Sequence, residues 1–168
     1  MSIGSRLGDQ RPKLQQSDAT TMIMTNAFDY SYSGDIFVGS KGQSHEVVYD
    51  TGSDWLCLES SDCEQCQAEK FKYKESASFK QLQSESSVRE YGSASLMGFE
   101  VTDLTCIVPH TEDEISKGNT SFCKQDFEFF LVTKQKGLNE KYSGVCGLAR
   151  SKFKPAADER DLGPLLVK

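Results

Sequence analysis

Residues 45–60 constrain the fold more than any other stretch of the chain. The β-branched pair Val47-Val48 leads into Asp50-Thr-Gly-Ser53, and a second apolar stretch, Trp55–Leu58, follows at once. This pattern predicts a strand, a tight turn and a second strand. The glycine lets the backbone reverse where a side chain would clash. Asp50 is therefore expected at the apex of a rigid turn, beside N–H and O–H donors that stabilise a carboxylate.

The composition fits one domain with a hydrophobic core. The chain has 168 residues, of which 37% are hydrophobic, and its 13 glycines stand between short apolar runs that favour an all-β fold. The net charge of −6 argues against nucleic acid as a partner, because phosphates would repel the protein. No run approaches the roughly 20 apolar residues that span a bilayer, so no membrane partner is expected.

The N-terminal sequence and the cysteine count disagree. The first twenty residues are polar, and no signal peptide is visible in them. Six cysteines are typical of a secreted protein, and Asn119-Thr-Ser121 is a candidate glycosylation site. The simplest resolution is that the chain is a fragment. We expect residues 1–21 to form an N-terminal arm, with a propeptide remnant as one interpretation.

The cysteines predict at least one small disulfide loop. Cys63-Glu-Gln-Cys66 has no second pair to complete a zinc site and does not follow a βαβ pattern, which favours a local disulfide over a metal or a redox motif. A bond between Cys106 and Cys123 would close the polar insertion between them, although spacing does not fix connectivity. The sequence leaves Cys57 and Cys146 either paired or free and buried.

Further patterns outline the remaining elements. The sequence predicts an edge strand within 22–28, strands at 32–39, 127–132 and 142–149, a hairpin over 90–104 that turns near Gly98, and the beginning of an amphipathic helix in 155–168. His45 and His110 have no nucleophile pattern beside them, and we expect both to be solvated.

Five segments, in this order, resemble the N-terminal lobe of a pepsin-like aspartic protease. They are Thr25–Gly39 (the opening strand), Asp50-Thr-Gly-Ser53 (the catalytic turn), Cys63–Cys66 with Ser76-Ala-Ser-Phe79 (the disulfide loop and the stretch beyond it), Tyr91-Gly-Ser-Ala-Ser95 (the flap) and Ser143–Ala149 (the closing strand). The resemblance covers roughly residues 22–168. It implies twisted, barrel-like sheets and a short C-terminal helix, with the lobe cut within or just after that helix.

The resemblance also implies roles for individual residues. Asp50 would be one of two catalytic aspartates, and the other implied roles are the brace of the turn (Thr51, Gly52), a hydrogen bond to the Asp50 carboxylate (Ser53), the flap tyrosine (Tyr91), flap contacts to peptide (Gly92, Ser93, Ser95) and the cleft wall (Val48, Val145). It likewise implies the disulfide Cys63–Cys66. The alternative for Tyr91 is an aromatic residue packed within a strand.

Three positions depart from the family pattern. Cys57 stands where the family commonly has a tryptophan that partners the flap tyrosine, and Trp55 lies two residues earlier. Ala94 replaces the second glycine of the flap, and Ser143 replaces an aspartate of the closing strand. These differences affect the expected flap geometry and specificity more than the expected fold.

The family's chemistry needs a second carboxylate that shares a proton with the first. Asp-Thr-Gly occurs once, at 50–52, and Asp-Ser-Gly does not occur. The expected function is therefore that of an aspartic endopeptidase, with the isolated chain inactive and with no metal or cofactor. The expected partners are a peptide or protein substrate and a C-terminal lobe, in a longer chain or a second copy. The resemblance implies a secreted, lysosomal or vacuolar location.

Two other hypotheses stay open at this point. The chain could be a non-catalytic one-lobe protein that binds a peptide or a partner. It could also form a homodimer in which each copy contributes one aspartate.

Overall fold

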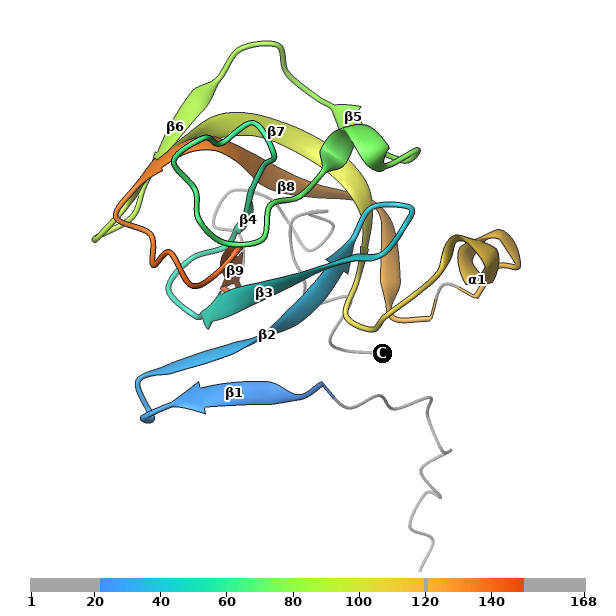
Figure 1. The fold of residues 1–168 in the computed structure, drawn as a ribbon, viewed down its shortest axis with the longest axis horizontal. Helices are drawn as coiled ribbons and strands as arrows, with labels where there is room; N and C mark the ends of the chain where they lie inside the picture. Colours follow the sequence, from blue (N-terminus) through green and yellow to red (C-terminus); the bar gives the residue numbers. More distant parts are fainter. Residues whose placement is uncertain (1–21, 120, 150–168) are drawn as a thin grey trace, which may run out of the picture.

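The computed structural model describes residues 22–119 and 121–149, and strands are the main regular structure in this part (Figure 1). In chain order the elements are β1 (Met24–Ala27), β2 (Ser31–Val38), β3 (Gln43–Asp50), β4 (Leu56–Glu59), the 3-10 helix η1 (Tyr73–Glu75), β5 (Lys80–Gln81), β6 (Ser87–Glu90), β7 (Ser95–Cys106), α1 (Glu112–Ser116), β8 (Cys123–Lys136) and β9 (Gly144–Gly147). The all-β prediction is confirmed. The arm expected at 1–21 and the helix expected in 155–168 lie outside the described residues.

The strands form one mixed sheet that closes on itself. Their order is β1-β2-β3-β9-β4-β8-β7-β5, and β6 pairs with β7. The pairs β3–β9 and β4–β8 are parallel. A further pairing of β2 with β7, through Phe37 with Cys106 and Val38 with Thr105, joins distant members of the order. Figure 1 shows β7 and β8 arching over the other strands, with β1 at the outer edge. The closure makes a barrel-like lobe.

Alternation along the strands divides the core into two clusters. On β4, Leu56 and Leu58 face the larger cluster, whereas Cys57 faces the smaller one. The larger cluster comprises Ile36, Val38, Val47, Leu56, Leu58, Phe71, Val101, Ile107, Phe127, Phe129, Leu131 and Cys146. The small cluster comprises Trp55, Cys57, Ala94, Leu96, Phe130 and Val132. Because β4 is buried on both faces, its sequence is continuously apolar up to Glu59.

Both histidines are buried, so the prediction that they are solvated was wrong. His45 alternates with Val47 on β3 and faces the core, where its ring lies edge-on to Phe71 with centroids 5.6 Å apart. Burial lowers the pKa of His45 to about 4. His110 lies with Nε2 3.0 Å from the carbonyl oxygen of Gly39. Both histidines have polar neighbours in the sequence, which favours exposure. The pleat of the strand and the packing of the loop nevertheless turn both side chains inward.

The hairpin expected over 90–104 turns earlier than the sequence suggested. The reversal lies at Tyr91–Ala94, between β6 and β7, and Gly98 is inside β7. A Cβ atom on Gly98 would lie 2.0 Å from the carbonyl oxygen of Leu131 on β8. The pairing of β7 with β8 shifts register between Met97 and Gly98. This glycine therefore serves close packing of two backbones rather than a turn.

A short helix, α1, occupies the polar insertion where only a loop was expected. Thr111 caps its N-terminus: Oγ1 accepts from Glu114 N at 3.3 Å, and Thr111 N donates to Glu114 Oε2 at 2.8 Å. This reciprocal pair is a capping box. The Thr-x-x-Glu spacing was visible in the sequence and could have predicted the helix.

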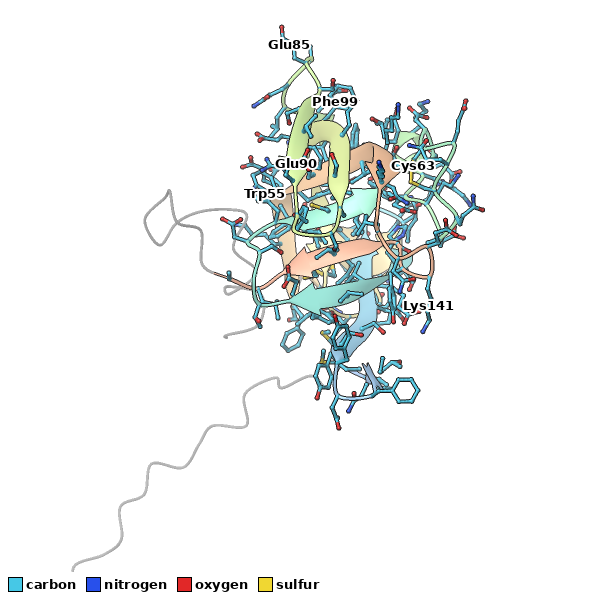
Figure 2. The ribbon with its side chains drawn as sticks, turned by 90° about the vertical axis from the view of Figure 1, so that its left-hand side faces the viewer. Trp55, Cys63, Glu85, Glu90, Phe99 and Lys141 are labelled. Atoms are coloured by element: carbon cyan, nitrogen blue, oxygen red, sulfur yellow. A yellow bond between two sulfur atoms is a disulfide. The ribbon has the colours of Figure 1, made fainter. Side chains whose placement is uncertain are left out.

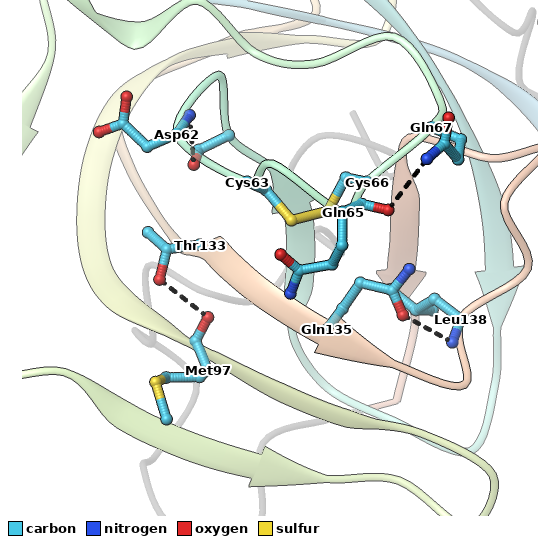
Figure 3. Close-up of a disulfide and its surroundings, with 10 residues drawn as sticks. Asp62, Cys63, Gln65, Cys66, Gln67, Met97, Thr133, Gln135 and Leu138 are labelled. Carbon is cyan, nitrogen blue, oxygen red and sulfur yellow. Dashed lines mark hydrogen bonds between the residues drawn. A yellow bond between two sulfur atoms is a disulfide. The ribbon is translucent and has the colours of Figure 1, made fainter.

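Two disulfides tie the loops to the sheet. Cys63 and Cys66 are bonded across the loop after β4 (Figure 3). Cys106 and Cys123 are bonded where they stand opposite each other on β7 and β8, at the base of the insertion. Cys57 and Cys146 are free and buried.

Replacing Gly144 by Ala is expected to lower the free energy of unfolding by about 2–4 kcal/mol. The added Cβ would lie 1.9 Å from the carbonyl oxygen of Cys57, so β9 and β4 would have to separate. Urea unfolding measures the loss. Gly92→Ala is the control, because nothing lies within 4 Å of its added carbon. Wild-type stability in Gly144→Ala would contradict the close pairing of these strands.

Candidate active site

Asp50 lies at the end of β3, where the chain turns toward β4. Its Oδ1 accepts a hydrogen bond from the Gly52 backbone N–H at 2.8 Å. The two residues that follow β9 are hydrogen-bonded to the turn. Leu148 N donates to Asp50 O at 2.8 Å, and Ala149 N donates to Ser53 O at 2.9 Å. The half-buried Asp50 carboxylate is thus presented on a backbone that is tied at both ends.

The turn differs from expectation at Ser53. The family resemblance implied a hydrogen bond from Ser53 to the Asp50 carboxylate. In the part of the chain described, Ser53 Oγ is buried and makes no hydrogen bond, and the donor to Asp50 is the Gly52 amide. Thr51 and Gly52 are exposed. The carboxylate therefore depends on a backbone donor rather than on the serine hydroxyl.

The β6–β7 hairpin lies beside this turn, as Figure 2 indicates by placing Trp55 and Glu90 on the same side of the molecule. Tyr91 N donates to Ala94 O at 2.7 Å, and Ala94 N donates to Tyr91 O at 3.2 Å, which closes a tight tip. Gly92 and Ser93 are exposed at that tip. We call residues 87–98 the flap.

The Tyr91 hydroxyl has found a partner in place of the absent tryptophan. It lies 3.1 Å from Cys57 Sγ, at hydrogen-bonding distance, and either group can donate. Burial raises the pKa of the Cys57 thiol to about 11 and raises the pKa of Tyr91 as well, so both groups are protonated at acid and neutral pH. A neutral hydrogen bond thus links the flap to β4.

A cleft of about 650 Å³ separates the flap from the Asp50 turn. It is lined by Asp50, Gly52, Ser53, Asp54, Trp55, Val88, Arg89, Glu90, Tyr91 and Gly92. Of the residues expected at the site, the structure brings Asp50, Gly52, Ser53, Tyr91 and Gly92 together around this space.

The other expected site residues do not line the cleft. Val48 and Val145 are paired in register on β3 and β9, and both are half-buried. Ser95 donates to Glu90 Oε1 at 2.9 Å within the flap. Asn119 is exposed after α1, far along the chain from the cleft residues.

Sequence analysis missed Arg89. Its guanidinium carbon lies 3.6 Å from the centroid of the Trp55 ring, and its Nη2 donates to Glu100 Oε1 at 2.7 Å. The sequence offers one signal for Arg89: it lies two residues before Tyr91, so in an extended chain the two side chains share one face.

One cluster has the residue types of a metal site. Ligand atoms of Cys106, His110 and Cys123 lie within 4.8 Å of one another. The two sulfurs are joined in a disulfide, so neither is a thiolate that could bind a metal ion.

Comparisons with known proteins identify the family of the chain. The family description "Eukaryotic aspartyl protease" matches residues 31–159, most of the chain. The chain belongs to this family. The chain that has this cleft beside its Asp-Thr-Gly turn is therefore a member of the aspartyl protease family. In the part of the chain that the structure describes, no helix is long and apolar enough to cross a membrane.

Several curated aspartyl proteases match over most of the chain. Cyprosin from Cynara cardunculus is 28% identical over 145 residues, which cover 82% of this chain and 28% of that protein. Aspartic proteinase A1 from Arabidopsis thaliana is 29% identical over 150 residues, 85% of this chain and 26% of the relative. Chymosin from Callithrix jacchus is 29% identical over 135 residues, 75% of this chain and 35% of the relative. The matched region is thus about a quarter to a third of each relative.

Proposed function

We propose that this chain supplies Asp50, one of two catalytic carboxylates, to an aspartic endopeptidase, and that the isolated chain does not hydrolyse peptides. The observation that carries this proposal is the cleft in which Asp50 and the flap residue Tyr91 face the same space. Membership in the aspartyl proteases supports a proteolytic function. The single Asp-Thr-Gly at 50–52 supports the need for a second carboxylate from elsewhere.

The proposed reaction is general acid–base attack of water on a peptide bond. In aspartic proteases generally, two carboxylates about 3 Å apart share one proton, so one activates water while the other protonates the carbonyl oxygen. Here Asp50 takes one of these roles, held by the Gly52 N–H. Thr51 would brace the turn against its counterpart. The buried Ser53 hydroxyl, without a hydrogen bond among the described residues, would donate to the completed carboxylate pair.

The proposed substrate is a peptide held extended beneath the flap. Extended peptides bind by strand-like backbone hydrogen bonds. The exposed backbone of Gly92 and Ser93 could offer such bonds from above, with Ser95 supporting the flap. Val48 and Val145, adjacent on β3 and β9, would contact substrate side chains once the second lobe completes the cleft.

The second lobe would dock on the β1–β2 side of the molecule. Phe28 and Tyr30, in the turn between β1 and β2, are almost fully exposed, and Tyr32 is partly exposed. Tyr32 stands opposite Tyr49, the neighbour of Asp50, so this aromatic surface lies at the same end of the sheet as the catalytic turn. Exposed apolar surface of this kind is typical of an interface.

A secreted, lysosomal or vacuolar location is part of the proposal. The two disulfides support it, because such bonds persist in oxidising compartments. The exposed Asn119 would be glycosylated there.

The decisive experiment assays the 168-residue chain at about pH 4, near the ionisation range of aspartate, with a fluorogenic peptide and a statine-type inhibitor. We expect no cleavage by this chain alone, and inhibitor-sensitive cleavage once a lobe with a second Asp-Thr-Gly or Asp-Ser-Gly is supplied. The transcript beyond Lys168 is the first place to seek that lobe. Inhibitor-sensitive activity that rises with the square of chain concentration would favour the homodimer. Peptide binding with no activity in any combination would favour the one-lobe binding protein.

The contact between Tyr91 and Cys57 is expected to contribute about 1 kcal/mol to folding of the lobe. A double-mutant cycle with Tyr91→Phe and Cys57→Ala isolates the pair from the cavity that the alanine leaves. Urea unfolding of the four proteins gives the coupling energy. Additive effects of the two substitutions would show that the hydroxyl and the thiol do not interact.

A further inference from the structure

The side chain of Arg89 is enclosed by groups from three separate segments: the residue before β4, strand β7 and strand β8. Its guanidinium carbon lies 3.6 Å from the ring centroid of Trp55 and 4.7 Å from that of Phe130 on β8. Its Nη2 donates to Glu100 Oε1 on β7 at 2.7 Å, and the Arg89 and Glu100 side chains are each only 22% exposed. Gln83 Nε2 holds the other Glu100 oxygen at 3.1 Å. These contacts hold the guanidinium group of Arg89 against two aromatic rings and one carboxylate.

The contacts require a planar guanidinium group. A flat, delocalised cation can stack on an indole ring and donate to a carboxylate in the same plane, whereas the ammonium of lysine is a compact point charge. The Arg89 Nε is buried and has no hydrogen-bond partner among the described residues, so the position of the guanidinium group depends on the stacking and on the bond to Glu100. Arg89 is also the one cation among the described residues that line the cleft.

The position of Arg89 makes this side chain a link between the flap and the catalytic turn. Among the described strands, β6 pairs with β7 alone. Val88 and Glu90, on either side of Arg89, are exposed. Trp55, in contrast, is buried five residues after Asp50. Arg89 therefore joins the outer strand of the flap to the segment that carries the carboxylate.

We propose that Arg89 is a positioning residue that holds the flap closed over the Asp50 cleft by stacking on Trp55 and pairing with Glu100. The inference deepens the proposed function and rests on it for its catalytic meaning, because it concerns the flap of the same cleft. The flap opens when the guanidinium leaves the Trp55 ring. The Tyr91–Cys57 hydrogen bond is a second, weaker attachment on the same face of β6 and its turn.

The test uses the 168-residue chain and needs no proteolysis. In Arg89→Lys, we expect amide hydrogen exchange in residues 87–98 to speed up roughly tenfold, with no change in β3 and β9. Trp55 is the chain's single tryptophan, so its fluorescence reports on the stack directly. Acrylamide should quench Trp55 fluorescence more strongly in Arg89→Lys, because the guanidinium group no longer shields the indole ring from solvent. A residue with a merely structural role would speed exchange throughout the lobe instead.

Lys141→Met is the matched control. Lys141 lies 5.0 Å from the ring centroid of Tyr142, so it has the same type of contact away from the flap. This variant should leave both flap exchange and Trp55 quenching unchanged. If Arg89→Lys fails to fold, Glu100→Gln tests the proposal instead. This substitution weakens the ion pair between Arg89 and Glu100 and keeps the arginine. Wild-type exchange and quenching in a folded Arg89→Lys or Glu100→Gln variant would overturn the proposal.

Kinetics separate this inference from the proposed function. In an enzyme form with both aspartates, Arg89→Lys should raise KM about tenfold and change kcat less, because a loosened flap weakens the bound states uniformly. A fall in kcat at constant KM would overturn the positioning role. If the wild-type form has no activity, the proposed function fails, yet exchange and quenching still decide whether Arg89 holds the flap.

Discussion

Replacing Asp50 by Asn should lower kcat by about three orders of magnitude in an enzyme form that pairs this chain with a second lobe. Asparagine has the shape of aspartate and can still accept the Gly52 N–H bond, but it cannot exchange a proton with water. The folded lobe should be almost unaffected, because the half-buried carboxylate makes no ion pair among the described residues. Steady-state cleavage of a fluorogenic peptide at about pH 4 measures the first effect, and thermal unfolding measures the second.

Asp54→Asn is the matched control for this prediction. Asp54 lines the same cleft four residues later, so its loss changes the charge of the cleft equally without touching the Asp-Thr-Gly turn. We expect a change in kcat of less than about tenfold. Equal losses in the two variants would mean that the cleft needs negative charge in general. Unchanged turnover in Asp50→Asn would remove this residue from the chemistry.

Replacing Glu59 by Gln should stabilise the lobe by about 3 kcal/mol at pH 8 and change its stability little at pH 4. The Glu59 side chain on β4 is fully buried, and its two oxygens have no hydrogen-bond partner in the part of the chain described. Burial raises the pKa of this carboxyl to about 7. Between about pH 4.5 and 7 the unfolded chain releases the proton while the folded lobe keeps it, so wild-type stability falls as pH rises. Glutamine cannot ionise and removes this loss.

Urea unfolding at pH 4, 6 and 8 measures the difference between the two proteins. Glu85→Gln, at an exposed position, should show no such dependence on pH. A constant difference between Glu59→Gln and wild type across the three pH values would contradict a neutral Glu59 in the folded lobe.

His45 acts on stability in the opposite direction. Because its pKa is lowered to about 4, the unfolded chain binds a proton below about pH 6.5 while the folded lobe does not, and stability falls as pH decreases to 4. Between about pH 4.5 and 6.5 the contributions of His45 and Glu59 offset each other. We therefore expect a plateau of stability at mildly acid pH, with losses on both sides.

The features that sequence predicted well are those that local patterns determine. The Asp50 turn follows from two apolar strands that flank Asp-Thr-Gly, and the structure has β3 and β4 on either side of it. The closing strand around Val145 likewise follows from a short apolar run with glycines. In each case residues adjacent in sequence carry the information.

The features that sequence analysis missed depend on contacts between distant segments. His45 is buried because Phe71, from a later loop, packs against it. Arg89 is charged and lies on a short strand, where exposure is the usual expectation, yet Trp55 and Glu100 enclose it. No spacing in the sequence shows that these residues meet. Tyr91 and Cys57 are a partial exception, because the family pattern already marks position 57 as the neighbour of the flap tyrosine, and Cys57 contacts Tyr91 there.

The register shift between Met97 and Gly98 determines which part of the lobe can bend. An irregularity of this kind interrupts the ladder of hydrogen bonds and increases the local bend and twist of the strand. Beyond the shift, the first residues of β7 pair with β6 on one side and with the last residues of β8 on the other. These three strands form a plate that extends beyond the register shift. We expect a large substrate to enter by a tilt of this whole plate, because its strands stay hydrogen-bonded, rather than by separation of the two strands at its tip.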